Sequence, residues 1–250
     1  MDTFVKNTTG RAADWEAAGL EWLARAEPDG GVRICRVLGR PDGGLELERI
    51  REAAPSKSAA GAFGQALAVT HDAGAPAFGA GPDGWEGDGY HGPAGQQLDL
   101  RLGSWESWGE FCAAARVAPL VRAGRFGADE RALFGKLCDR LRAGDFDDDD
   151  APARCHGDLW SGNVLWSEDE VVLIDPTAFG GHRESDLAAL SLFGAPHLRE
   201  IIAGYQQVHP LQEGWEDRVA LHQIHLMLLH AVLFGGGYVT RALEIARRYA

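Results

Sequence analysis

The chain has 250 residues, and its 24 Lys and Arg against 37 Asp and Glu give a formal net charge of −13. This acidic balance argues against a nucleic-acid binder, because that class usually carries a basic patch that displaces phosphate counterions. Hydrophobic residues make up 45% of the chain, and with a charged fraction of 24% and eight Trp this composition excludes a disordered chain. The length fits two unequal lobes.

The sequence shows no sign of export or of a membrane span. No apolar run approaches the roughly 20 residues that a span needs, and the first ten residues lack the basic-then-apolar layout of a secretion signal. We therefore expect a cytoplasmic protein without a membrane or nucleic-acid partner. No C-x-x-C pair occurs, so free buried thiols are expected at Cys35, Cys112, Cys138 and Cys155.

The first part of the chain predicts a small α+β lobe over residues 1–52. A short strand ends at Lys6, the polar run 7–10 is typical of a turn, and a helix begins near Asp14, which we expect to cap it. The apolar stretches Ile34–Leu38 and Leu45–Ile50 are separated by turn residues and predict a hairpin.

Residues 53–250 predict a larger and mainly helical lobe. The glycine-rich stretch 79–95 predicts a long loop, and the acidic run of Asp145 and Asp147 to Asp150 predicts a solvated loop, because like charges this dense repel one another. Helical spacing is found over Ala59–His71, Ser107–Ala123, Asp129–Ala143, Glu184–Phe193, Arg199–Val208 and Trp215–Phe234.

A short hairpin in the second lobe suggests a metal site. The runs Val164–Trp166 and Val171–Ile174 flank four polar residues, and in a hairpin symmetric about Asp169 the residues Asn163 and Asp175 would lie opposite each other. Directly opposed residues have Cα atoms about 4.5–5.5 Å apart. An amide oxygen and a carboxylate at this spacing suit Mg²⁺.

Further residues complete the set that phosphoryl transfer requires. Asp158 lies five residues before Asn163, so a tight turn would bring its carboxylate beside the same ion as a proton acceptor. Lys6 ends a strand and would supply a cation for the other phosphates, and Glu16 on the next helix would pair with it. The order of these features along the chain is that of a kinase-like catalytic core.

These segments resemble the fructosamine kinase (ketosamine-3-kinase) family, within the aminoglycoside-phosphotransferase-like and protein-kinase-like superfamily. The resemblance is carried by H-G-D-L-W-S-G-N at 156–163, D-P-T-A-F-G-G-H-R-E at 175–184 and W-x-x-F-x-x-x-x-R at 108–116. Aminoglycoside phosphotransferases share the H-G-D-x-x-x-x-N skeleton but generally have Trp after the later metal-binding Asp, whereas Pro176 follows Asp175 here.

The resemblance implies a two-lobed protein-kinase-like fold and a role for each matching residue. Asp158 would be the catalytic base, Asn163 and Asp175 the Mg²⁺ ligands, and Lys6 the lysine that contacts the α- and β-phosphates of ATP, with Glu16 as its partner. Other expectations concern the hinge residues Glu48 to Ile50 near adenine, His156 as a brace of the catalytic loop, Asp186 as the anchor of the helix that follows, and Trp160 either in the sugar pocket or in the core.

The family's reaction transfers the γ-phosphate of ATP to the 3-hydroxyl of a ketosamine, free or bound to protein, and the unstable product breaks down to free the amine. Two alternatives stay open at this point. One is a small-molecule kinase of the aminoglycoside or choline type, and the other is an inactive nucleotide-binding pseudokinase.

The sequence departs from the family at its start. In the family a glycine-containing hairpin precedes the lysine strand, but here five residues precede Lys6. We therefore expect an N-terminal lobe that lacks the first hairpin, weak ATP binding, and an exposed strand edge at Thr3–Lys6 through which a homodimer would form.

Overall fold

A small antiparallel sheet forms the amino-terminal end of the molecule, with strand order β1-β4-β3. It consists of β1 (Thr3–Lys6), β4 (Leu45–Glu48) and β3 (Val37–Gly39), and helix α1 (Arg11–Ala24) follows β1. The predicted strand, turn and helix are thus present. The computed structural model describes residues 2–8, 10–41, 44–92, 95–168 and 170–250.

Two details of this region differ from the prediction. Helix α1 begins after Gly10 without a side-chain cap, and the Asp14 carboxylate instead pairs with Arg40 at 2.8 Å. The expected strand Ile34–Leu38 is divided in two, because β2 (Arg33–Ile34) pairs in parallel with β9 (Val171–Leu173) while β3 pairs with β4. An apolar run predicts that its residues are buried, but it does not predict which sheet each half joins.

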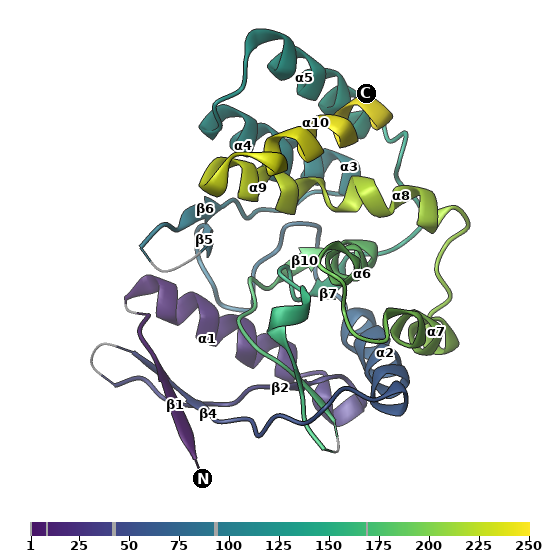
Figure 1. Ribbon diagram of the computed structural model, residues 1–250. Coiled ribbons are helices and arrows are strands. Elements are labelled where there is room, and N and C mark those ends of the chain that lie inside the picture. Colours follow the sequence, from purple (N-terminus) through teal and green to yellow (C-terminus); the bar gives the residue numbers. More distant parts are fainter. Residues whose placement is uncertain (1, 9, 42–43, 93–94, 169) are drawn as a thin grey trace.

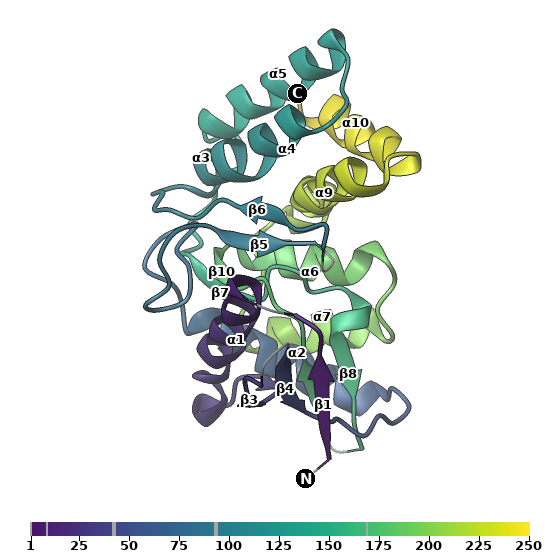
Figure 2. The same ribbon diagram turned by 90° about the vertical axis from the view of Figure 1, so that its left-hand side faces the viewer.

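The rest of the chain is mainly helical, so the expected α+β class is confirmed. In Figures 1 and 2, β1 and β4 lie toward one end of the molecule and α4, α5 and α10 lie at the other. The further helical segments are α2 (Lys57–Asp72), α3 (Trp108–Phe111), the π-helical η2 (Cys112–Val117), α4 (Ala118–Ala123), α5 (Ala128–Arg142), α6 (Arg183–Leu192), α7 (Leu198–Val208), α8 (Trp215–His222), α9 (Ile224–Phe234) and α10 (Gly237–Tyr249), with short 3-10 turns η1 (Glu27–Asp29) and η3 (Ser161–Asn163).

Two hydrophobic cores hold these elements together. One core joins α1 and β4 to α2, α7 and the hairpin of β8 (Val164–Trp166) and β9, so it includes side chains from both sides of the predicted boundary at residue 52. The other joins α3, α5, α9 and α10. The division into lobes 1–52 and 53–250 stays a prediction. All four cysteines are free and buried, as expected.

Two helical predictions need correction. The expected helix Trp215–Phe234 is interrupted at Gln223, which separates α8 from α9. Helix α10 was not predicted, although Ala242, Ala246 and Tyr249 fall on one buried face at helical spacing. Gly235 and Gly236 both have positive φ, of 66° and 60°, and this link turns the chain so that α10 packs back against α9.

The glycine-rich stretch is a loop over residues 79–88, as expected, but a short strand follows at residues 89–91. Within it, β5 (Gly89–His91) pairs antiparallel with β6 (Leu98–Leu100). The Cβ of a side chain at position 89 would lie 2.5 Å from the Trp15 ring, so Gly89 lets the strand pass directly over that buried ring.

The acidic run is a loop, as expected, but it is solvated only in part, because Asp145, Asp147 and Asp149 are exposed whereas Asp148 and Asp150 are half-buried. Asp147 Oδ1 accepts a hydrogen bond from Gly109 N at 2.7 Å, and Asp148 Oδ1 lies 3.0 Å from His182 Nε2. Asp150 Oδ2 lies 3.2 Å from the buried Arg183 Nε. Opposite charges and donors from other elements thus offset the repulsion within the run.

Among the described residues, none of the helices is both long and apolar enough to cross a bilayer.

Strand β1 lies at the edge of its sheet and exposes Phe4 and Val5, as expected. Pairing of this edge with a second copy stays a prediction.

Candidate active site

The loop of residues 156–163 is held from behind by the carboxylate of Asp186. Strand β7 (Ala153–Cys155) leads into this loop, and Asp186 on α6 accepts hydrogen bonds from the backbone N–H groups of His156 at 2.7 Å and Gly157 at 3.0 Å. Burial acts to raise the pKa of Asp186, but its partners, His71 first among them, outweigh burial and lower it. The ionised Asp186 side chain thus anchors the loop of residues 156–163, whereas the sequence predicted an anchor of helix α6 alone.

Two other residues fix the course of the loop. His156 is buried, its Nε2 lies 2.8 Å from the Ile174 carbonyl oxygen, and its Nδ1 accepts a hydrogen bond from Asp158 N at 3.3 Å, so it braces the loop as expected. Gly157 has φ 82°, and a Cβ there would lie 2.3 Å from the Thr177 carbonyl oxygen. Only glycine fits this position without displacing the backbone.

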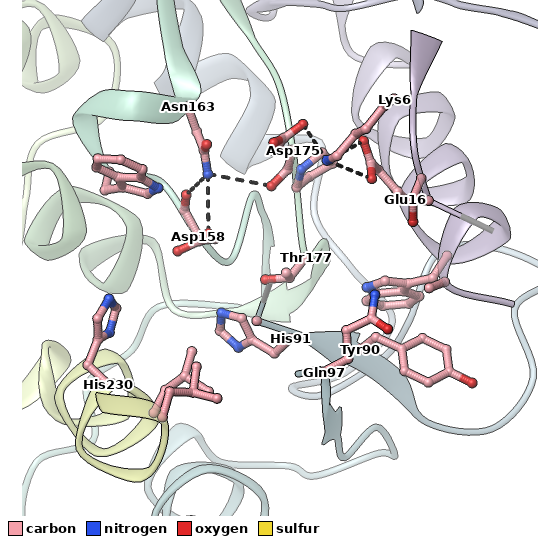
Figure 3. Close-up of a pocket in the computed structure, with 18 of the residues that line it drawn as sticks. Lys6, Glu16, Tyr90, His91, Gln97, Asp158, Asn163, Asp175, Thr177 and His230 are labelled. Atoms are coloured by element: carbon pink, nitrogen blue, oxygen red, sulfur yellow. Dashed lines mark hydrogen bonds and ion pairs between the residues drawn. The ribbon is translucent and has the colours of Figure 1, made fainter. Parts of the chain in front are cut away.

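Asp158 and Asn163 meet within the loop. Asn163 Nδ2 donates to the Asp158 carbonyl oxygen at 2.7 Å and to Asp158 Oδ2 at 3.2 Å (Figure 3). Burial raises the pKa of Asp158 to about 6, the charges of Asp186 and Asp175 act in the same direction, and the Asn163 hydrogen bond opposes them. A carboxylate with this pKa is well suited to accept a proton near neutral pH.

The β8–β9 hairpin brings Asp175 to the same place, but in a register different from the one predicted. Val164 pairs with Leu173 and Ser167 with Glu170, so the ladder is offset by one residue from symmetry about Asp169, which lies outside the described residues. Asn163 therefore faces Ile174, whose N–H donates to the Asn163 carbonyl at 3.1 Å. Asp175 follows with φ 54°, a strained conformation for a non-glycine residue, and its carbonyl oxygen lies 3.5 Å from Asn163 Nδ2.

Lys6 joins the hairpin to the small sheet. Its Nζ lies 2.8 Å from Asp175 Oδ1 and 3.0 and 2.9 Å from the two carboxylate oxygens of Glu16, so the expected Lys6–Glu16 pair is present (Figure 3). Burial acts to lower the pKa of Lys6, but Glu16 and Asp175 outweigh it and the pKa is raised. The ammonium is thus held charged between two carboxylates.

These five side chains line one cavity of about 580 Å³. Lys6, Glu16 and Thr8 lie on the side of β1 and α1, whereas Leu233, Phe234 and Tyr238 come from the ends of α9 and α10. Trp160 also lines the cavity and is 39% exposed, so it belongs to the pocket and not to the core.

The profile of one protein family covers nearly the whole chain. It is the profile of fructosamine kinase, and it matches residues 13–249. The chain belongs to the fructosamine kinase family.

Several known proteins match this fructosamine kinase family member over nearly its whole length. A probable ketoamine kinase of Synechocystis is 32% identical over 98% of this chain and 82% of the relative. The crystal structure of a Thermobifida fusca protein, assigned as a fructosamine-3-kinase, is 40% identical with a TM-score of 0.87 over 98% of this chain and 84% of that one. A structure of aminoglycoside phosphotransferase APH(4)-Ia, 18% identical over 99% of this chain and 91% of that one with a TM-score of 0.56, shares the protein-kinase-like fold that the sequence predicted.

The two hinge residues do not join this cavity. The Glu48 side chain is buried, accepts a hydrogen bond from Arg36 N at 2.9 Å and pairs with Arg33 at 2.7 Å. Ile50 is partly buried against the core that contains β4. In this fructosamine kinase family member the Glu48 side chain is therefore occupied by structural contacts, and a backbone role of residues 48–50 toward adenine stays a prediction.

Several residues of the cavity are not predicted from the sequence. Tyr90, His91 and Gln97 reach it from the β5–β6 pair, and Thr177 from the segment after Asp175 (Figure 3). Turn glycines flank β5, so its short strand is not recognisable from the sequence. Residues that come together only through tertiary packing show no periodic pattern.

We predict that Gly157→Ala destabilises the protein more than Gly84→Ala. Gly84 has nearly the same φ, 79°, but nothing lies within 4 Å of a Cβ built there, so its substitution adds only the backbone strain of about 1–2 kcal/mol. At Gly157 the clash with the Thr177 carbonyl adds a further ~1–3 kcal/mol, as overpacking usually does. Urea unfolding of both variants measures the difference, and equal losses would contradict the close packing of the loop.

Proposed function

We propose that this protein is an ATP-dependent kinase that phosphorylates the 3-hydroxyl of a ketosamine, with Mg²⁺ as the metal. A ketosamine is a sugar joined through C1 to an amine, either free or on a lysine side chain of a protein. The phosphorylated product is unstable and releases the amine, so the role would be deglycation repair. Membership of the fructosamine kinase family supports this proposal.

One observation carries the proposal beyond family membership. A proton acceptor, Asp158, lies beside two oxygen-bearing side chains, Asn163 and Asp175, in the same cavity as the Lys6–Glu16 pair. A base, two oxygen ligands and a positioned ammonium are the groups that phosphoryl transfer needs, because catalysis of this reaction is mostly positioning and charge stabilisation.

In the proposed reaction the acceptor hydroxyl approaches Asp158. Since Asp158 Oδ2 accepts the Asn163 hydrogen bond, Oδ1 is the oxygen with free capacity to accept the hydroxyl proton. The sugar oxygen then forms a bond to the γ-phosphorus, the bond between that phosphorus and the β–γ bridging oxygen breaks, and ADP leaves. The proton stays on Asp158 until it exchanges with solvent.

The residues at the hairpin end fit a divalent cation. Asn163 and Asp175 provide the oxygen donors that Mg²⁺ prefers, and the trio of Glu16, Asp175 and Lys6 carries two carboxylates against one ammonium. Mg²⁺ would neutralise phosphate charge at this position. Glu16 holds the Lys6 side chain in position, so its ammonium would be available to the phosphates when Asp175 holds the metal.

Trp160 is our candidate for contact with the sugar, since it is two residues from Asp158 and partly exposed in the cavity. Indole rings stack well on the apolar faces of sugars. A cytoplasmic location stays a prediction.

The function is tested by incubating the protein with ATP, Mg²⁺ and a panel of glycated lysines that carry fructosyl, ribulosyl or erythrulosyl groups. We expect ADP release with at least one of them and a phosphate on its O3, measured by coupled assay and NMR. Phosphorylation only of an aminoglycoside or of choline, or no ADP release with any acceptor, would contradict the proposal.

We predict that Asp158→Asn lowers kcat by about 10²–10⁴-fold, the usual contribution of a general base, while ATP binding changes little. In the unsubstituted protein kcat/KM should rise with pH, with its midpoint near the Asp158 pKa of about 6, because the base must be deprotonated. Activity of this variant within threefold of the parent would exclude Asp158 as the base.

A further inference from the structure

A continuous group of aromatic side chains extends the cavity away from Lys6. Phe193 follows α6, His230 and Phe234 lie on α9, and Tyr238 lies on α10, and we call these four residues the aromatic wall. Ring centroids are 5.7 Å apart for Phe193–His230, 4.9 Å for His230–Tyr238 and 6.2 Å for Phe234–Tyr238. Trp160 continues the wall toward Asp158 through its contact with Phe193 at 5.8 Å.

The wall is unusually exposed for aromatic side chains. Phe234 is 58% exposed and Phe193 is 42% exposed, yet both line the cavity that contains Asp158. Large apolar side chains that gather at the rim of a cavity are typical of a binding surface and not of a folding core.

The wall lies on the acceptor side of Asp158. The small sheet is at one end of the molecule and α10 at the other in both ribbon views, and in Figure 3 His230 lies away from Lys6 and Glu16. Lys6 and Glu16 are the proposed pair on the side of the ATP phosphates, and the acceptor lies on the other side of the reacting hydroxyl. The part of the acceptor beyond that hydroxyl therefore extends toward the wall.

The wall also has the chemistry to bind a cation. Aromatic faces attract ammonium groups by about 0.5–2 kcal/mol. In addition, His230 Nδ1 lies 2.7 Å from the Leu226 carbonyl oxygen, which can only accept a hydrogen bond, so Nδ1 must be the donor. With Nδ1 as the donor, the ring in its neutral form has Nε2 as an acceptor for an ammonium N–H.

We propose that the aromatic wall binds the amine side of the acceptor, meaning the cationic secondary amine on C1 and the first carbons of the chain attached to it. This inference rests on the proposed function, in which the amine lies two carbons from the carbon that bears the reacting hydroxyl. The wall therefore selects ketosamines over sugars without an amine, and Phe193, His230, Phe234 and Tyr238 determine this selectivity.

The test compares three acceptors built on whichever sugar the unsubstituted protein phosphorylates best. The first is its adduct with the side-chain amine of Nα-acetyl-lysinamide, whose only charge is the cationic secondary amine. The second is a 1-O-alkyl ether of the same sugar with a stem of equal length, which is neutral. The third is the 1-deoxy sugar, which has no stem. Phe234 is the position to change, since it is the most exposed ring of the wall and its substitution leaves the core intact.

For Phe234→Ala we expect kcat/KM to fall about 3- to 10-fold with the lysine adduct, consistent with the loss of one cation–aromatic contact, and to stay unchanged with the 1-deoxy sugar. Phe234→Leu keeps an apolar side chain but removes the ring, so it should lose activity with the lysine adduct and not with the ether. Val208→Ala, an exposed apolar residue outside the cavity, should match the parent with all three acceptors.

Equal changes with all three acceptors, or no change with the lysine adduct, would overturn the role of the wall. Absence of phosphorylation of any ketosamine by the unsubstituted protein would instead contradict the proposed function. The KM for ATP should be the same in all variants, and a rise in it for Phe234→Ala would also count against the inference.

Discussion

The Lys6 ammonium is the group on which the site depends. It contacts Glu16 of α1 and Asp175 of the hairpin end, and so it ties the small sheet, the first helix and the 156–175 segment to one point. Each contact is between opposite charges that are at least partly shielded from water, where their attraction is stronger than at the open surface. Without this cation, the neighbouring carboxylates of Glu16 and Asp175 would repel each other.

The second support of the site is rigid backbone. Asp186 fixes the N–H groups of residues 156 and 157, and the hairpin fixes Asn163, which directly precedes the first cross-strand pair of Val164 with Leu173. The proposed base and the proposed metal ligands are therefore positioned by hydrogen-bonded backbone segments. This arrangement suits a reaction whose barrier is lowered mainly by orientation and fixed charge.

The sequence predicted the identity of these groups because the order of motifs reflects the fold. A strand ending at Lys6, a helix carrying Glu16 and a hairpin flanked by Asn163 and Asp175 were all readable from local patterns. The register of the hairpin was not, because four polar residues between the strands allow pairings that differ by one residue. Asp175 nevertheless lies in the site, because the chain changes direction at this residue, whose φ is positive.

Other features depend on contacts that local patterns do not encode. The division of the stretch 34–38 between two sheets, the partners of Asp148 and Asp150, and the meeting of Phe193 with His230 and Tyr238 each join distant segments. Helix α10 is a different case, since its buried face at Ala242, Ala246 and Tyr249 is periodic and was readable beyond the glycines that precede it.

The proposed metal site is tested most directly by a crystal structure with Mg²⁺ and a non-hydrolysable ATP analogue. We expect one Mg²⁺ with Asn163 Oδ1 and an Asp175 carboxylate oxygen both at about 2.0–2.1 Å, the usual distance for this ion, and with Lys6 Nζ in contact with a phosphate oxygen. A nucleotide bound with its metal held by neither Asn163 nor Asp175 would contradict it.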